Sequence, residues 1–274
     1  MAPSKIEPTT PAPLTRRQFA SAALATPLLL STPSAASAHA PLLEDGERKI
    51  IDPAADAVAH PSRPDQDKAR DADRLPAKVL DFFDLKPGMH IADLMAGDGY
   101  YTELVSRLAG ENGVVYCQNT KIPLQVFADA PLTERLANDR LPNVVRLDRE
   151  FDDIGIPQGV DAAILIRFYH DFGWQEVDRD GFNQLIFHLV KPGGVFGVVD
   201  HIALPDAGMS VGQSLHRVEP ALVRREIEAA GFVLEAESRV LANPEDTHDW
   251  NIFSGGGARR DQTDRFAYLF RKPL

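Results

Sequence analysis

The residues of this chain that are best suited to proton chemistry are histidines and aspartates in three short segments. His170 and Asp171 are adjacent, Asp200 and His201 are adjacent, and His216 lies further along the chain. An unperturbed imidazole titrates near neutral pH, so each histidine could act as a general base, with a carboxylate to orient its ring. We interpret His170 as the first candidate for that base, with Asp171 or Asp200 as its orienting partner. A structural role with satisfied hydrogen bonds is the alternative for each histidine.

The same side chains also offer the nitrogen and oxygen atoms that bind divalent metals. A metal site built from His170, His201 and His216, with Asp171 and Asp200, is therefore a second interpretation. The spacing of these residues is long-range and matches no local metal-binding motif. The histidines could equally line a polar pocket. We predict a site without metal.

Apolar runs place these residues at the ends of predicted strands. Residues 160–166 form a near-continuous apolar run, which is typical of a buried parallel strand and leads to His170. Residues 195–199 form a second such run, which ends at Asp200. Ligands of open α/β sheets bind outside the carboxyl ends of the strands. Both segments are therefore predicted to lie at the functional edge of a sheet.

A glycine turn follows another predicted strand. Residues 91–94 have the apolar content of a buried strand, and residues 95–99 then form a tight turn with two glycines. A helix is predicted over residues 101–108, because apolar residues recur there at helical spacing, and Gly110 is placed to end it. This arrangement brings backbone N–H groups and the positive end of a helix up to a ligand. Asp93 is the most informative residue here, because a charge inside a strand is costly without a polar partner.

The turn sequence resembles motif I of the class I S-adenosylmethionine (SAM)-dependent methyltransferases. It reads DLMAGDG, with Asp93 four positions before the first glycine, and it lacks the third glycine of the dinucleotide-binding fingerprint. The sequence KPGG at residues 191–194, followed by an apolar strand, is similarly typical of strand five in this family. The segments around His170 and Asp200 are also similar to an uncharacterised bacterial group of predicted methyltransferases.

The resemblance covers about residues 70–274. It implies an α/β, Rossmann-like class I methyltransferase fold, with a seven-stranded, mostly parallel sheet and helices on both faces. It also implies an enzyme that transfers a methyl group from SAM to a small-molecule acceptor. The alternative is an exported small-molecule-binding or metal-dependent protein on the same fold, without methyl transfer.

The resemblance assigns these residues to the SAM site: Asp93, Met95, Ala96, Gly97, Gly99, Asn119 and Glu150. Gln118 and Asn119 end the second predicted strand, residues 113–117, where the family usually has Asp or Glu to bind the ribose hydroxyls. An amide binds a ribose without the charge assistance of a carboxylate. Weaker SAM binding is therefore expected, and a plain turn role is the alternative for Asn119. Glu150 occupies the position of the acidic contact to the adenine amino group, in a segment that also reads as a solvated loop.

Composition narrows the classes of function. The chain has 274 residues, 44% of them hydrophobic, and its net charge of −11 argues against nucleic acid as the main partner. No apolar run approaches the ~18–20 residues of a membrane-spanning helix. The single cysteine, Cys117, excludes an internal disulfide and is expected to be a small buried hydrophobe.

The beginning of the chain, residues 1–38, is predicted to be a twin-arginine (Tat) signal peptide. Arg16 and Arg17 precede a modestly apolar stretch, and small residues then fit a cleavage site. A disordered tail with an accidental arginine pair is the alternative. We therefore expect a periplasmic or secreted protein, with an extended leader over residues 39–68 and one methyltransferase-like domain over residues 69–274.

Overall fold

The computed structural model describes residues 52–257 and 259–274. The predicted signal peptide and the first part of the predicted leader lie outside these residues. Within them, seven strands form one sheet. In chain order the strands are β1 (His90–Leu94), β2 (Val114–Asn119), β3 (Val144–Asp148), β4 (Val160–Ile166), β5 (Val190–His201), β6 (Val233–Ser238) and β7 (Arg265–Arg271).

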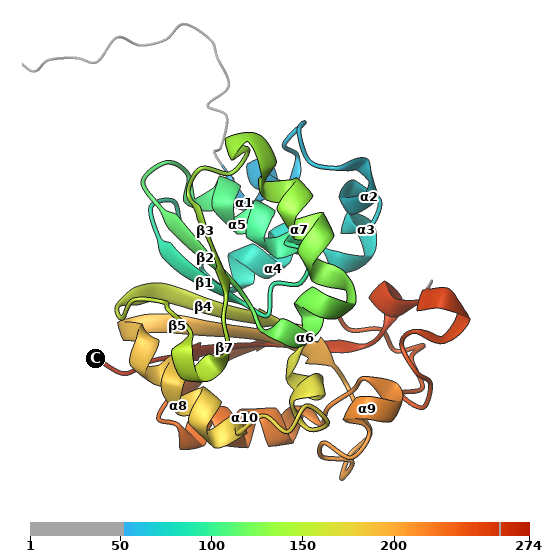
Figure 1. Cartoon of the computed structure of the whole chain (residues 1–274). Coiled ribbons are helices and arrows are strands. Elements are labelled where there is room, and N and C mark those ends of the chain that lie inside the picture. Colours follow the sequence, from blue (N-terminus) through green and yellow to red (C-terminus); the bar gives the residue numbers. More distant parts are fainter. Residues whose placement is uncertain (1–51, 258) are drawn as a thin grey trace, which may run out of the picture. The chain divides into compact units, whose positions relative to one another are not determined.

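Helices cover both faces of this sheet (Figure 1). The α-helices are α1 (Pro53–Val58), α2 (Asp65–Lys68), α3 (Asp71–Arg74), α4 (Pro76–Phe82), α5 (Tyr100–Ala109), α6 (Lys121–Pro123), α7 (Asp129–Leu136), α8 (Arg179–Leu189), α9 (Gly212–Leu215) and α10 (Pro220–Ala229). The short π- and 3-10 helices are η1 (Leu124–Ala128), η2 (Ala137–Asp139), η3 (Phe151–Asp153), η4 (Tyr169–Phe172), η5 (Ser254–Gly257) and η6 (Arg260–Gln262). None of these described helices is long and apolar enough to cross a membrane.

Two apolar cores lie on the two faces of the sheet. Helices α1, α4 and α5 cover one face, and α8 and α10 cover the other. Side chains alternate between the faces along each strand, so Ile91 belongs to the first core and the next residue, Ala92, belongs to the second. This two-sided burial is why the central strands, such as β4 and the second half of β5, are nearly continuous apolar runs.

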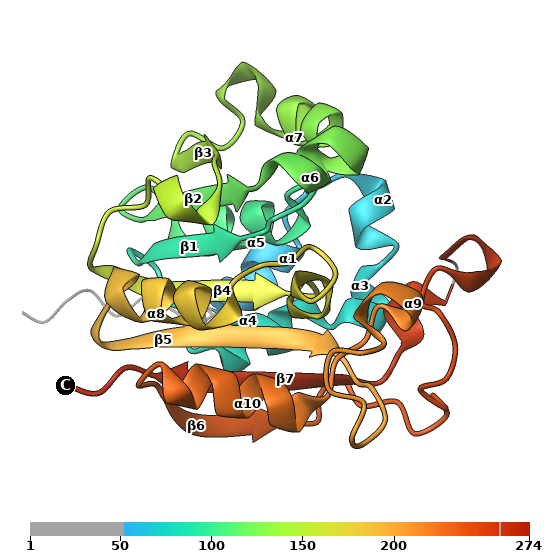
Figure 2. The same cartoon turned by 60° about the horizontal axis from the view of Figure 1, so that its bottom comes forward.

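The strand order is β3-β2-β1-β4-β5-β7-β6. Every neighbouring pair is parallel except the two pairs that contain β7. The predicted seven-stranded, mostly parallel sheet is therefore confirmed. The chain reverses its direction of strand addition between β1 and β4, and open α/β sheets bind ligands outside the carboxyl ends at such a switch point. Figure 2 shows the arrowheads of the parallel strands on one side, where α3, α9 and the loop after β6 also lie.

The predicted strand, glycine turn and helix of motif I are also confirmed. Helix α5 follows Gly99, whose backbone φ of 81° is one that glycine adopts without strain. The helix ends at Gly110, which has a φ of 66°. Its apolar stripe includes Leu104 and Leu108, both buried against the sheet.

Residues 52–68, the described part of the predicted leader, are folded rather than extended. Helix α1 begins at Pro53, and the Asp52 side chain caps it by accepting from the Ala55 N–H at 3.0 Å. Ala54 and Ala57 are buried in the core with α4 and α5. The content of alanine and proline favoured a linker, but small alanines also suit a helix that packs closely on other helices. The domain therefore begins before residue 69.

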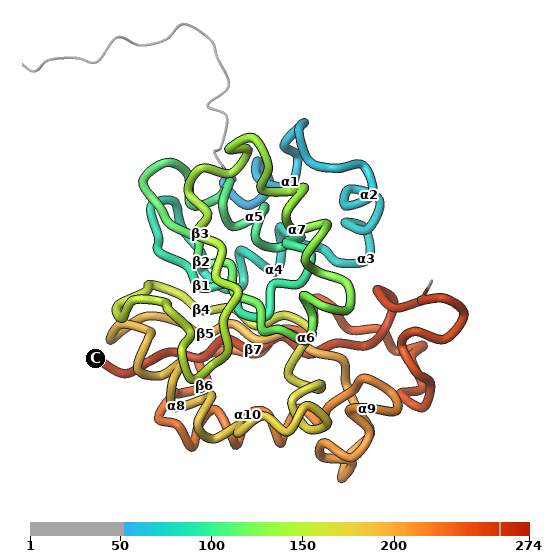
Figure 3. Tube along the Cα trace, viewed as in Figure 1, coloured from blue at the N-terminus to red at the C-terminus, as the bar shows by residue number. Residues whose placement is uncertain are grey.

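Residues 71–82 form two helices, α3 and α4, with a break between them. Leu75 has a left-handed backbone with a φ of 44°, so α3 ends there and Pro76 begins α4. Figure 3 traces this segment in blue and cyan from α1 past α2 and α3 into α4. The break leaves Arg70, the residue before α3, and Arg74, the last residue of α3, at the carboxyl edge of the sheet.

Candidate functional site

A cavity of about 170 Å³ lies at the carboxyl edge of the sheet, where β1, β4 and β5 end. Six of the predicted site residues line it: Met95, Ala96, Gly97, His170, Asp171 and His201. The structure therefore brings the motif I turn and the two histidine segments together, as their positions at strand ends predicted. The other predicted residues lie behind or beside this cavity.

His170 is held between two carboxylates. Its Nδ1 lies 2.7 Å from Asp200 Oδ1, and its Nε2 lies 3.3 Å from Asp171 Oδ1. The backbone N–H groups of His170 and His201 also donate to the Asp200 carboxylate. Burial alone would lower the pKa of His170, but the charges of Asp200 and Asp171 raise it above its ordinary value. This environment favours the imidazolium form.

The environment of His201, unlike that of His170, favours the neutral form of the ring. Its Nδ1 lies 2.6 Å from Thr263 Oγ1, and that hydroxyl donates to the backbone carbonyl of Arg260 at 3.3 Å. When the hydroxyl hydrogen lies on that carbonyl, Nδ1 donates to Thr263 and Nε2 carries the lone pair, which is the tautomer that a general base requires. Burial lowers the pKa of His201 well below its ordinary value, and the nearby Arg167 lowers it further. His201 is therefore a neutral imidazole at the cavity wall.

Asp171 connects His170 to His216. Its Oδ1 accepts from Trp174 Nε1 at 2.7 Å and lies 3.1 Å from His216 Nδ1. Burial would raise the pKa of Asp171, but His170 and His216 hold it below its ordinary value. Ligand atoms of His170, Asp171 and His216 lie within 4.8 Å of one another, a spacing that could hold a metal ion. The structure thus gathers three of the five side chains of the metal interpretation.

The amide groups of the motif I turn are used within the protein, contrary to prediction. The Met95 N–H donates to Gln118 Oε1 at 3.2 Å, and the Ala96 N–H donates to the Gln118 carbonyl at 3.0 Å. The Gly97 N–H donates to Asn119 Oδ1 at 2.8 Å, while Asn119 Nδ2 donates to the Gly97 carbonyl at 3.1 Å. Asn119 is fully buried. Its amide therefore locks the turn, and this favours the turn role over the ribose role.

The two glycines of the turn serve different purposes. Gly97 lines the cavity, and a side-chain carbon there would lie 3.4 Å from the half-exposed ring of Phe127. At Gly99 such a carbon would lie 2.9 Å from both Leu132 and Arg135, which belong to α7. Gly97 thus borders the cavity beside Phe127, whereas the missing side chain of Gly99 lets α7 pack closely on the turn.

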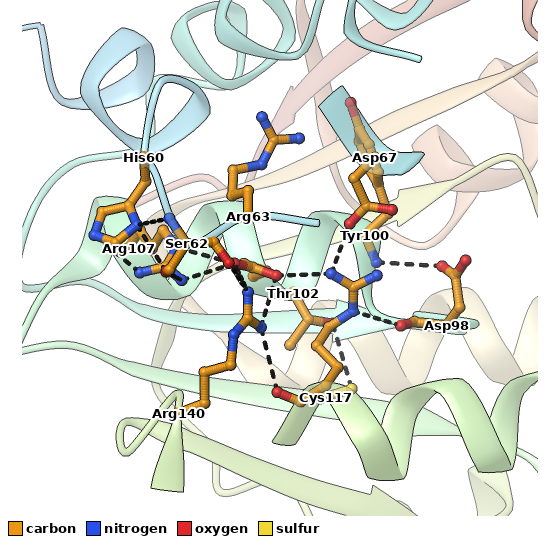
Figure 4. Close-up of polar contacts among 12 residues, drawn as sticks. His60, Ser62, Arg63, Asp67, Asp98, Tyr100, Thr102, Arg107, Cys117 and Arg140 are labelled. Atoms are coloured by element: carbon orange, nitrogen blue, oxygen red, sulfur yellow. Dashed lines mark hydrogen bonds and ion pairs between the residues drawn. The ribbon is translucent and has the colours of Figure 1, made fainter. Parts of the chain in front are cut away.

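Asp93 lies behind the turn, outside the cavity lining. It is 2% exposed, and its Oδ2 accepts from Thr102 Oγ1 at 2.6 Å. Burial raises the pKa of Asp93 to about 7. Thr102 also contacts Cys117 Sγ at 3.3 Å, and Figure 4 shows these two side chains next to each other. Cys117 is buried, as predicted, and burial raises the pKa of its thiol to about 12.

Glu150 lies beside a second cavity, beyond the ends of β2 and β3. The volume of that cavity is about 470 Å³, and its walls include Lys121 and Asp148. Glu150 is exposed and accepts from the Lys121 N–H at 2.9 Å. A carboxylate oxygen thus remains open to solvent at the place predicted for adenine.

No protein-family model matches this sequence, and no curated protein matches it. Solved structures are similar to it in fold. A SAM-dependent methyltransferase from Aquifex aeolicus matches with 21% identity and a TM-score of 0.53, over 76% of this chain and 97% of that one. The cyclase SpnF matches with 18% identity and a TM-score of 0.52, over 74% and 82% of the two chains. A protein assigned as a sarcosine dimethylglycine methyltransferase from Galdieria sulphuraria matches with 17% identity and a TM-score of 0.51, over 74% and 85%.

The chain has the class I methyltransferase fold. At these identities the likeness shows the fold alone.

Four arginines that sequence reasoning missed also line the cavity of this methyltransferase fold. They are Arg70, Arg74, Arg167 and Arg260. They come from segments far apart in the chain, so no local motif contains them. One sequence signal was available for Arg167, because it directly follows the apolar run of β4.

A buried ion network fixes the turn from behind. Glu103 of α5 pairs with Arg135 at 2.7 Å and with Arg140 at 2.5 Å, and Arg135 also pairs with Asp67 at 2.7 Å. Arg135 Nε donates to the carbonyl of Asp98, within the turn, at 2.7 Å. Figure 4 shows Asp67, Asp98 and Arg140 among these polar contacts. The segment predicted as a leader is therefore part of the support of the site.

Proposed function

We propose that this protein transfers a methyl group from SAM to a small-molecule acceptor. One observation carries the proposal: Gly97 of the motif I turn and the ring of His201 line the same cavity. The fold, which is also that of a SAM-dependent methyltransferase, supports the identity of the cofactor. The volume of about 170 Å³ favours a compact acceptor.

The residues of the motif I turn suit the methionine end of SAM. Gly97 leaves room under an exposed aromatic ring, as a close approach of the cofactor requires. The ribose of SAM has weaker partners, because the amide of Asn119 is used on the turn and that of Gln118 is used on the turn and on the Arg149 carbonyl. The exposed carboxylate of Glu150 is able to accept from the adenine amino group. We therefore expect SAM to bind, with low affinity.

His201 is the residue that we assign as the base. When bound, SAM supplies a methyl group on a positively charged sulfur, and the protein has to hold the acceptor and accept its proton. The neutral ring of His201 has a lone pair on Nε2 for this purpose. The pKa of His170, the first candidate from the sequence, is raised by Asp200 and Asp171, which favours the charged form that lacks such a lone pair. We assign His170 and Asp200 a positioning role.

Calorimetric titration with S-adenosylhomocysteine tests the cofactor, and its formation from SAM with compact hydroxyl and amine acceptors tests turnover. The variant His201→Gln should lower kcat by about 10²–10⁴-fold and leave the affinity for S-adenosylhomocysteine unchanged. His188→Gln, on the exposed face of α8, is the matched control and should behave as the wild type. Absence of S-adenosylhomocysteine binding would remove the proposal.

The pH profile of kcat/KM distinguishes the two histidines. The pKa of His201 is lowered well below 6.5, so the neutral base persists and the acid limb should lie well below pH 6.5. The pKa of His170 is raised above 6.5, so a base at that position would place the limb above pH 6.5. An acid limb above pH 6.5 that survives in His201→Gln would return the role to His170.

A metal-dependent function without methyl transfer is the second candidate. The observation that favours it is the convergence of His170, Asp171 and His216 within 4.8 Å. Elemental analysis of the purified protein tests it, because a metal bound there should be lost in His216→Gln. Full methyl transfer by a metal-free protein would exclude this candidate.

We also propose that the protein is exported by the twin-arginine route, on the basis of Arg16, Arg17 and the small residues that follow the apolar stretch. That route carries folded proteins, so a cofactor could be loaded before export. Replacing both arginines by lysine should retain the precursor in the cytoplasm of a bacterium with this pathway. Unchanged export of the double variant would show that the signal has been misread.

A further inference from the structure

Four arginines converge on the cavity from three parts of the fold. Arg70 precedes α3, and Arg74 is the last residue of that helix. Arg167 directly follows β4, and Arg260 is the first residue of η6. The chain as a whole carries a net charge of −11. Guanidinium groups that are close together in a partly buried space repel one another, so this cluster destabilises the folded protein unless negative charge compensates it.

One carboxylate serves three of these arginines. Asp261 accepts from Arg70 Nε at 2.8 Å and from Arg74 Nε at 3.2 Å, and it is also paired with Arg167. Asp261 is mostly buried, so these pairs are screened little by water. A single negative charge cannot balance three positive ones. The set therefore keeps an excess of positive charge at the cavity wall.

The fourth arginine, Arg260, has no such partner. Within the described residues its guanidinium group makes no hydrogen bond or ion pair, and its contact is with the ring of Phe253 at 5.6 Å. Burial lowers the pKa of Arg260 and the charge of Arg70 lowers it further, while the charges of Asp261 and Asp98 raise it without restoring the ordinary value. Burial likewise lowers the pKa of Arg167 to about 10, with contributions from Arg260 and Arg70. The arrangement leaves donors with unused hydrogen-bonding capacity facing the cavity.

The other carboxylates at the cavity are engaged elsewhere. Asp171 accepts from Trp174 and lies within 3.3 Å of ring nitrogens of His170 and His216. Asp98 accepts from the N–H of Tyr100 at the start of α5. Neither makes an ion pair with the four arginines in the described part of the chain.

We propose that Arg70, Arg74, Arg167 and Arg260 bind an anionic group, a carboxylate, sulfate or phosphate, of the ligand that occupies the cavity. Guanidinium groups bind such groups with charge-assisted and often bidentate hydrogen bonds. If the anion belongs to the methyl acceptor, that acceptor is a compact acid, because the cavity lined by His201 has a volume of about 170 Å³. The inference rests on the proposed function only for the source of the anion, which belongs either to the methyl acceptor or to the methionine carboxylate of SAM.

The first experiment measures anion binding directly. Sodium phosphate and sodium sulfate are titrated into the whole protein by calorimetry at constant ionic strength, with chloride as the balancing ion. Wild type should show saturable binding, and Arg260→Gln should weaken it by about 10- to 100-fold, the effect of losing charged hydrogen bonds. Arg260→Lys should retain part of the affinity, because it keeps the charge. Thermal unfolding of each variant checks that it is folded.

The matched control is the neighbouring residue. Arg259 is exposed and stacks on Trp250 at 4.3 Å, outside the cavity lining. Arg259→Gln changes the net charge of the protein by the same amount and should bind both anions as wild type does. An equal loss of anion affinity in Arg259→Gln and Arg260→Gln would show that only the net charge of the protein matters, and it would contradict the proposed site. Absence of saturable binding in the wild type would overturn it as well.

The second experiment identifies the source of the anion. S-adenosylhomocysteine carries the methionine-type carboxylate, whereas 5′-methylthioadenosine lacks that end. If the arginines hold the cofactor, Arg260→Gln weakens S-adenosylhomocysteine alone, and S-adenosylhomocysteine displaces phosphate. If they hold the acceptor, both nucleosides bind equally to wild type and variant, and phosphate binds beside them. Phosphate binding without any nucleoside binding would contradict the methyltransferase proposal and support the anion site.

Discussion

The structure reverses the expected effect of a carboxylate at position 119. By resemblance to the family, Asn119→Asp would restore a ribose ligand and strengthen SAM binding. In the structure the Asn119 amide is fully buried and forms two hydrogen bonds with the Gly97 peptide unit, one as acceptor and one as donor. An aspartate keeps the acceptor but has no hydrogen to donate to the Gly97 carbonyl. We therefore expect Asn119→Asp to destabilise the turn and weaken binding of S-adenosylhomocysteine.

The magnitude follows from what the substitution leaves unpaired. A lost buried hydrogen bond costs about 1 kcal/mol, and an unsatisfied buried carbonyl facing a carboxylate adds about 1–2 kcal/mol. The free energy of unfolding should therefore fall by about 2–3 kcal/mol. For a domain of this size each kcal/mol corresponds to about 2–4 °C, so the Tm should fall by about 4–12 °C.

Urea unfolding and calorimetry with S-adenosylhomocysteine measure these two effects in the same preparation. The control is Asn138→Asp, which makes the same chemical change at an exposed position of η2. It should leave both stability and binding unchanged. If Asn119→Asp is as stable as wild type and binds S-adenosylhomocysteine more tightly, the turn-locking role is wrong and the ribose role is right.

Two further predictions concern buried charges. The pKa of Asp93 is raised from 3.8 to about 7, so between these pH values the unfolded chain ionises while the folded one stays protonated. Stability should therefore fall by up to about 4 kcal/mol as pH rises from 4 to 7, and Asp93→Asn should flatten this part of the curve measured by urea unfolding. Arg217 is fully buried and pairs bidentately with Asp246 at 2.9 and 3.0 Å. Asp246→Asn should lower the free energy of unfolding by about 3–5 kcal/mol, whereas the exposed Asp249→Asn should have little effect.

The fold could be predicted from the sequence because its signals are local. About ten residues are enough to recognise each of these elements: the strand at 160–166, the glycine turn at 95–99 and the helix that follows the turn. Parallel strands then bring their carboxyl ends to one edge, so the meeting of Gly97 and His170 followed from topology without any contact being known. Helix α1 was missed because six residues of mostly alanine and aspartate form a helix only through packing on α4 and α5.

The arginines of the cavity could not be predicted as a group, because their convergence is not a local feature of the sequence. Arg70, Arg167 and Arg260 are separated by about a hundred residues each, and of these only Arg167, directly after the apolar run of β4, has a local signal. Their common property, a shortage of carboxylates around them, exists only in three dimensions. The role of Asn119 was hidden in the same way, because an amide at a strand end looks alike whether it faces a ligand or the neighbouring turn.

Asp200 explains how two similar histidine segments acquire different chemistry. Its carboxylate, at the end of β5, accepts from the ring of His170 and from the backbone N–H groups of His170 and His201. The ring of His170 thereby has a negatively charged neighbour. His201 contacts this carboxylate only through its backbone N–H, and its ring contacts the Thr263 hydroxyl. The same carboxylate thus favours the charged form of His170 and leaves His201 neutral beside Arg167. A pairing of His and Asp in the sequence identifies the segments that meet, but the atom to which each carboxylate is bonded determines which imidazole can accept a proton.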